Sequence, residues 1–112
     1  MEEGIPRKPY VISDRFFDSR AQVYSYGIRE FGYFQAECYN REIEKAIETL
    51  SHFYYVYPEC RHIPTKSRMY RNIIFDSHLI IYRITDERIE VLDIIHSASS
   101  IRKIRNARNI RL

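Results

Sequence analysis

Apolar residues recur at helical spacing over residues 14–50, and Gly32 divides this segment into two stretches. The first stretch has an apolar stripe with spacings of four and three residues, made of Phe17, Ala21, Tyr24, Ile28 and Phe31. The second has a similar stripe, made of Ala36, Tyr39, Ile43, Ala46 and Leu50. Ser13 and Asp14 suit a helix N-terminus. The pattern therefore predicts two helices with a minimal connection, as in an antiparallel helical hairpin.

β-branched residues dominate the second half of the chain. Three runs, at 69–75, 78–84 and 89–96, are separated by short turns, which predicts strands joined as antiparallel hairpins. A shorter run at residues 10–12 predicts one more strand before the helices. Residues 51–67 break both patterns with prolines and aromatic side chains, and we expect a long loop there.

The predicted fold class is α+β, with a single domain over residues 1–112 in the order β-α-α-β-β-β. Residues 1–9 form an N-terminal extension, and residues 97–112 form a basic tail or short helix. The two helices come from one continuous segment, so we expect both on one face of the sheet.

The opposite face of the sheet is more apolar than a solvated face. Alternation along the middle strand places Ile80, Tyr82 and Ile84 toward the helices. Leu79, Ile81 and Arg83 then point to the other face. An open face of this composition predicts a bound partner, and the alternative is that the tail folds back over it.

Composition and length exclude several classes of protein. No apolar run approaches the roughly 18 residues of a membrane span, and the first residues do not resemble a signal peptide, so a cytoplasmic protein without membrane contact is expected. The only two cysteines, Cys38 and Cys60, are expected to be reduced and structural. His78 and His96 can lie on neighbouring strands, but two histidines do not make a metal site. We expect no cofactor.

Four segments resemble a known family. Residues 31–39 are similar to the W-G-x-x-Q-A-x-x-Y signature of ParE-type toxins, with Phe31 in place of Trp. Residues 77–83 resemble their S-H-x-I-x-Y-R strand, residues 89–96 resemble the strand that ends in I-L-H, and Tyr70-Arg71 matches the Y-R that opens the hairpin. Over roughly residues 10–100 the chain therefore resembles the ParE branch of the RelE/ParE superfamily.

Two departures from the family pattern affect residues near the ends of the strands. Where the family often shows P-x-x-G-R, this chain has Pro58-Glu59-Cys60-Arg61, which is one residue shorter and lacks Gly. Where the family commonly continues with Arg-Met-Asp after the last strand, residues 97–100 read Ser-Ala-Ser-Ser. Any target contacts that the family makes through the missing residues are not carried over.

The resemblance implies the toxin of a type II toxin–antitoxin (plasmid stabilisation) system, which inhibits DNA gyrase and is neutralised by a cognate antitoxin. The assemblies expected for such a toxin are a homodimer or a heterotetramer with its antitoxin. We expect the antitoxin at the apolar face, on Leu79, Ile81 and Arg83.

The tail supplies the candidate contacts with the target. Residues 97–112 hold five basic residues and no acid, which leaves 13 of the 18 basic residues and all 15 acidic residues in the rest of the chain. The tail thus carries +5 and the remainder −2. We expect contacts with gyrase–DNA, rRNA phosphates or an acidic antitoxin segment, although a frayed, solvated terminus is the alternative. The tail residues expected to contact the target are Arg102, Lys103, Arg105 and Arg108.

The alternative function is a RelE-like endoribonuclease that cleaves mRNA on the ribosome. Such an enzyme needs an acid, a base and cations around the phosphate, and the residue types that fit here are His96, Arg83, Arg71 and Arg61. The RNase branch carries an Arg in the segment that matches Leu79-Ile80-Ile81, and an Arg and a Tyr after the last strand, which this chain lacks. The competing interpretation is that His96 only ends a strand and Arg83 only pairs with a carboxylate. The departures favour an inhibitor over an enzyme. A third possibility is a degenerate, non-toxic interaction protein.

Overall fold

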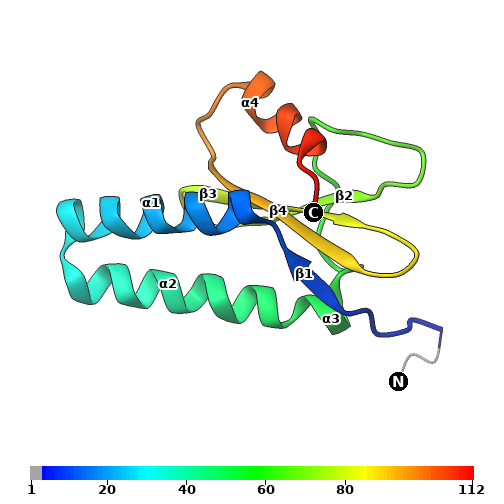
Figure 1. Ribbon diagram of the computed structural model, residues 1–112, viewed down its shortest axis with the longest axis horizontal. Coiled ribbons are helices and arrows are strands. Elements are labelled where there is room, and N and C mark those ends of the chain that lie inside the picture. Colours follow the sequence, from blue (N-terminus) through cyan, green and yellow to red (C-terminus); the bar gives the residue numbers. More distant parts are fainter. Residues whose placement is uncertain (1–3) are drawn as a thin grey trace.

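The computed structural model describes residues 4–112, which fold in the predicted α+β order. Four strands form one sheet, a two-helix hairpin lies on one face, and a short C-terminal helix lies on the other (Figure 1). The elements are β1 (Tyr10–Ile12), α1 (Asp14–Phe31), α2 (Tyr33–Glu48), α3 (Leu50–Phe53), β2 (Tyr70–Ile74), β3 (His78–Ile84), β4 (Ile89–His96), α4 (Ile101–Asn106) and the 3₁₀ turn η1 (Ala107–Asn109).

The sheet has the strand order β1-β4-β3-β2. The three C-terminal strands form the predicted antiparallel meander, and β1 adds to its β4 edge in parallel, with Tyr10 opposite Ile89. Ser13 fixes the turn from β1 into α1, because its hydroxyl accepts a hydrogen bond from the Phe16 amide and donates one to the Leu92 carbonyl. One side chain thus caps α1 and anchors it to β4.

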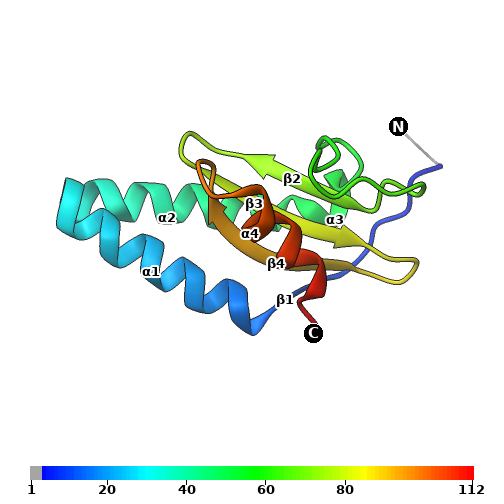
Figure 2. The ribbon, with the colours of Figure 1, turned by 90° about the horizontal axis from the view of Figure 1, so that it is seen from above.

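The helical hairpin packs on the sheet through its base only. Its distal half projects beyond the strands in both views (Figures 1 and 2). The predicted stripe of α1 is wrong in part. Ile28 and Phe31 are exposed on the projecting half, and in the first turn Phe16 is buried in place of Phe17. The two helices approach closely at Gly27, where an added Cβ would lie 3.3 Å from the Cβ of Ala36. Gly32, with a φ of 92°, allows the sharp turn between them.

The main core lies between the hairpin and the sheet. Ile80 and Tyr82 point into it as predicted, while Ile84 packs at its margin. The segment 51–67 was predicted as a loop, yet it begins with α3 and contributes Tyr54 to this core. The Tyr82 hydroxyl donates to the Tyr54 carbonyl at 2.6 Å, so the loop is tied to the middle strand.

A second core cluster covers the opposite face of the sheet. Ile104 and Ala107, from α4 and η1, pack against Ile81, Leu92 and Ile95, and the three strand residues are at most 2% exposed. The expectation of an open face is wrong, and the alternative of a tail that folds back is found. Leu79 and Arg83 remain half-buried at the margin of this cluster. The physical reason is that α4 and η1 have an apolar side that packs on the sheet. From the sequence alone, an ordered tail and a frayed one were both open.

Candidate functional site

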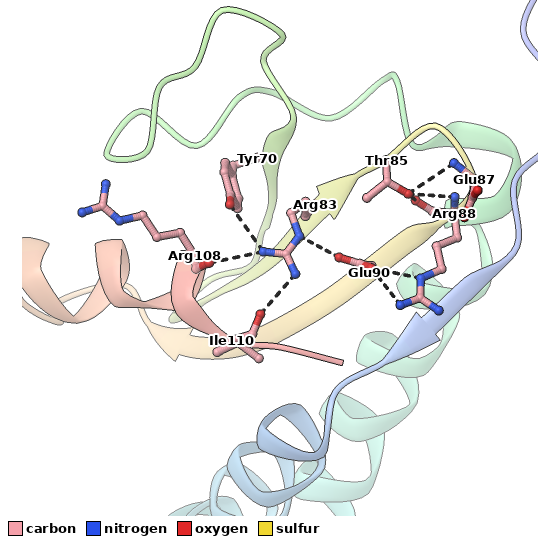
Figure 3. Close-up of polar contacts among 8 residues, drawn as sticks. All are labelled: Tyr70, Arg83, Thr85, Glu87, Arg88, Glu90, Arg108 and Ile110. Atoms are coloured by element: carbon pink, nitrogen blue, oxygen red, sulfur yellow. Dashed lines mark hydrogen bonds and ion pairs between the residues drawn. The ribbon is translucent and has the colours of Figure 1, made fainter.

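Arg83 is the centre of a polar network that holds the C-terminal tail on the sheet (Figure 3). It lies opposite Glu90 on β4, and its Nε donates to a Glu90 carboxylate oxygen at 2.6 Å. Its two terminal nitrogens donate to the carbonyls of Arg108 at 3.3 Å and Ile110 at 3.1 Å. We call Arg83, Glu90 and these two carbonyls the tail latch. The pairing of Arg83 with a carboxylate matches the structural interpretation of this residue.

The carboxylate of the tail latch serves two cations. Arg88 also bonds to Glu90, at 2.9 Å, so two guanidinium groups share one carboxylate. Burial would raise the pKa of Glu90, but the hydrogen bonds and charges of Arg83 and Arg88 outweigh it and leave that pKa lowered. Glu90 is therefore ionised at neutral pH, and Arg83 is held with its remaining donors aimed at the tail.

The ordered tail presents its cations outward. Arg102, Lys103, Arg105 and Arg108 are all exposed, while Ile104 and Ala107 are buried beneath them. The loop that follows Pro58 joins this surface, since the Arg105 side chain donates to the His62 carbonyl at 3.3 Å and Arg61, the residue before His62, is exposed. We call Arg61, Arg102, Lys103, Arg105 and Arg108 the basic face.

The four residues considered for RNA cleavage do not come together. Arg83 is five residues from His78 on β3, and His78 pairs with His96 across the strands, which places Arg83 roughly 17 Å from His96 at about 3.3 Å per residue. Arg71 pairs with Tyr82 and Arg61 follows Cys60, whose amide bonds to the Tyr70 carbonyl, so both lie at the Arg83 end of the sheet. His96 stands apart from all three cations.

Two of these cations are also occupied by structural bonds. Arg71 donates to the carbonyls of Arg68, Tyr55 and Tyr57, which ties the loop 54–68 to β2. Arg83 is committed to the tail latch. The exposed His96 accepts a hydrogen bond from the Ala98 amide through Nδ1, which fits its interpretation as the end of a strand.

A hollow of about 340 Å³ lies between the hairpin and the end of the sheet near His96. Tyr39 Oη and His78 Nδ1 share a hydrogen bond of 2.7 Å there, and the His78 and His96 rings are 5.3 Å apart. Burial and the neighbouring His96 lower the pKa of His78. Tyr39 was predicted only as a core residue of the helix. The register that pairs His78 with His96 could not be read from either strand alone.

The loop end of the hairpin exposes three aromatic side chains. Phe31, Tyr33 and Phe34 are 62%, 64% and 80% exposed, although the helical stripe predicted Phe31 in the core. Within residues 4–112, no three His, Cys, Asp or Glu side chains cluster as metal ligands would. In the same part of the chain, no helix is long and apolar enough to cross a membrane.

Comparison with known proteins gives two findings. A family model described as "ParE toxin of type II toxin-antitoxin system, parDE" matches residues 10–101. A solved structure described as the chromosomal ParDE TA system from P. aeruginosa superimposes with a TM-score of 0.66 over 80% of this chain and 96% of that chain, at 12% sequence identity. A similarity at this identity shows a shared fold. No curated protein sequence matches the chain.

Proposed function

Because this chain belongs to the ParE toxin family of type II toxin–antitoxin systems, we propose that it acts as a non-enzymatic inhibitor of DNA gyrase and is neutralised by a cognate antitoxin. The observation that carries the choice of mechanism is the separation of His96 from Arg61, Arg71 and Arg83. His96 lies roughly 17 Å along the sheet from Arg83, and Arg61 and Arg71 lie at the Arg83 end, so a base at His96 is too far away to act on a phosphate that these cations stabilise.

The basic face is the proposed contact with the target. The backbone that carries its four tail residues is held on the sheet by the tail latch and by the second core cluster. An ordered surface loses less conformational entropy on binding than a frayed terminus would. This supports a role for Arg102, Lys103, Arg105 and Arg108 in poisoning the target.

The antitoxin is proposed to bind the face of the sheet that carries Leu79, Ile81 and Arg83. Because α4 and η1 already cover Ile81, the antitoxin reaches this residue only if the tail moves. A homodimer or a heterotetramer with the antitoxin remains a prediction.

Induced expression in a bacterial host tests the proposal. We expect filamentation and DNA-damage signalling from the wild-type chain, and the same response from His96→Ala, since His96 is exposed and apart from the cations. Arg102→Gln combined with Arg105→Gln should reduce the response while keeping the fold. Arrested translation with cleaved ribosome-bound mRNA, lost in His96→Ala, would identify a RelE-like enzyme instead. Normal growth with wild-type protein present at high level would identify a non-toxic family member.

A further inference from the structure

The charges of this small domain are separated between its two sides. The tail carries five basic residues and no acid, and it lies on the face opposite the hairpin (Figure 1). Residues 14–48, which form the hairpin, hold five basic and seven acidic residues, for a net charge of −2. An anionic partner is therefore attracted to one side of the molecule and not to the other.

Acidic side chains on β4, beneath the tail, offset only the Lys103 charge of the basic face. Its two acids, Glu90 and Asp93, are 8% and 4% exposed, and Glu90 is already shared by Arg83 and Arg88. Asp93 attracts Lys103, and both line one hollow. Across the neighbouring loop, Glu59 is turned toward Arg68 and the Thr65 amide. The four arginines of the basic face thus keep their charge available to a ligand, while Lys103 is offset in part by Asp93.

The surface chemistry distinguishes between anionic partners. An acidic helix from another protein requires an apolar strip as well as charge, but Ile104 and Ala107 of the tail are 2% exposed and point into the sheet. Ile101, at the first residue of α4, is half exposed, and the rest of the outer surface of the helix is Arg, Lys and Asn. A surface rich in cations and poor in apolar area fits a phosphate backbone, whose recognition rests on charge.

We propose that the basic face is a binding surface for the phosphodiester backbone of a nucleic acid, independent of base sequence, which the toxin uses without help from its protein target. The tail latch positions this surface, because Arg83 holds the backbone of Arg108 and Ile110 and thereby keeps the segment that carries the cations on the sheet. This inference extends the proposed function, in which the target is a gyrase–DNA complex. It concerns DNA or RNA contacts that the toxin makes alone.

The test measures the fluorescence anisotropy of a labelled 20-base-pair DNA duplex, and of a 20-nucleotide RNA, with the full-length toxin at 50 to 200 mM salt. Four phosphate contacts to DNA predict a slope of log affinity against log salt of about −3.6, which is roughly a 150-fold loss of affinity across that range. Binding of either ligand with a steep slope supports the proposal, and the tighter of the two identifies the natural backbone. Undetectable binding of both at 50 mM salt overturns it.

A matched pair of triple variants shows whether the binding is local. The variant Arg102→Gln, Lys103→Gln and Arg105→Gln should reduce the slope by about one for each cation removed. The control, Arg29→Gln, Arg41→Gln and Lys45→Gln, removes the same charge from exposed positions of the hairpin and should leave the slope unchanged. Equal losses in the two variants would mean that only net charge matters, and they would overturn the proposal. Circular dichroism confirms that both variants are folded.

Two further measurements complete the test. Competition by a polyglutamate peptide should be weak, and equal competition by peptide and duplex would overturn the assignment to phosphodiesters. Gyrase cleavage complexes are measured in parallel with the same protein samples. Gyrase inhibition without nucleic-acid binding refutes this inference and leaves the proposed function standing, whereas nucleic-acid binding without any effect on gyrase refutes the proposed function alone.

Discussion

At the scale of single residues, Glu90 links two arginines and through Arg83 also holds the tail. It accepts bonds from Arg83 and Arg88 with 11% of its side chain exposed, so its removal leaves Arg83 without its charged partner. We predict that Glu90→Gln lowers the free energy of unfolding by about 2 kcal/mol at neutral pH, since hydrogen bonds to charged groups contribute in that range. Urea denaturation followed by circular dichroism measures this loss.

The effect of Glu90→Gln on the free energy of unfolding should depend on pH, because the pKa of Glu90 is lowered in the folded protein. The folded pKa of Glu90 is lowered, so its contribution is complete above the unfolded pKa of about 4.3 and is lost as pH falls through the folded pKa. The difference in unfolding free energy between wild type and Glu90→Gln should therefore shrink below about pH 4.3. A difference that stays constant down to pH 3 would mean that the carboxylate charge is not what stabilises the network. Glu87→Gln, at an exposed position in the β3–β4 turn, is the control.

At the scale of elements, the sequence predicts what is periodic and misses what depends on relative position. The four strands and two helices follow from β-branched runs and helical spacing, and all are found. The apolar stripe placed Phe17, Ile28 and Phe31 in the core. Ile28 and Phe31 are exposed because the hairpin is longer than the sheet beneath it, whereas Phe17 is exposed because the first turn of α1 turns Phe16 toward the core. Whether a helix has anything to pack against depends on the tertiary arrangement, which its own periodicity does not contain.

For the basic face and the tail latch, too, the residue types could be predicted from the sequence and the contacts between distant segments could not. The residue types of the basic face could be read from the sequence, and so could the alternation that sends Arg83 away from the hairpin. The meeting of Arg83 with the carbonyls of Arg108 and Ile110 could not, because backbone groups far along the chain carry no signal in their side chains. The separation of His96 from Arg83 also required the strand register.

Substitutions in the short helix α4 test whether the tail contributes to the stability of the fold. We predict that Ile104→Ala lowers the free energy of unfolding by about 2–4 kcal/mol, since it leaves a cavity against Ile81, Leu92 and Ile95. Ile101→Ala, in the same helix at 49% exposure, should change it by no more than about 0.5 kcal/mol. Thermal or chemical denaturation of the pair decides the point. Equal and small effects would show that the tail does not contribute to the fold in solution.

At the scale of the whole molecule, the sheet separates two surfaces that behave differently. The hairpin lies on one side and the tail on the other (Figure 1). The hairpin forms the main core and exposes aromatic side chains at its tip, and the tail covers an apolar face with a thin, charged layer. The tail is attached through few groups, chiefly Ile104, Ala107 and the tail latch. A layer held by so few contacts can open with a lower free energy than the main core.

This arrangement makes the tail and an antitoxin competitors for one surface. If the antitoxin contacts Ile81, the free energy of lifting the tail is subtracted from the free energy of binding. Weakening the tail latch should then strengthen antitoxin binding, although it weakens the fold. We predict that Glu90→Gln binds the antitoxin up to roughly tenfold more tightly than wild type, which corresponds to about 1.4 kcal/mol of tail displacement.

Calorimetry measures the affinity, and hydrogen exchange locates the change. Amides of residues 101–109 should exchange faster in the complex than in the free toxin, while those of β3 and β4 become more protected. Glu87→Gln, outside the tail latch, should bind like wild type. Greater protection of the tail in the complex, together with unchanged or weaker binding by Glu90→Gln, would place the antitoxin on top of the tail or on the hairpin side. The surface around Leu79, Ile81 and Arg83 would then be assigned to intramolecular packing alone.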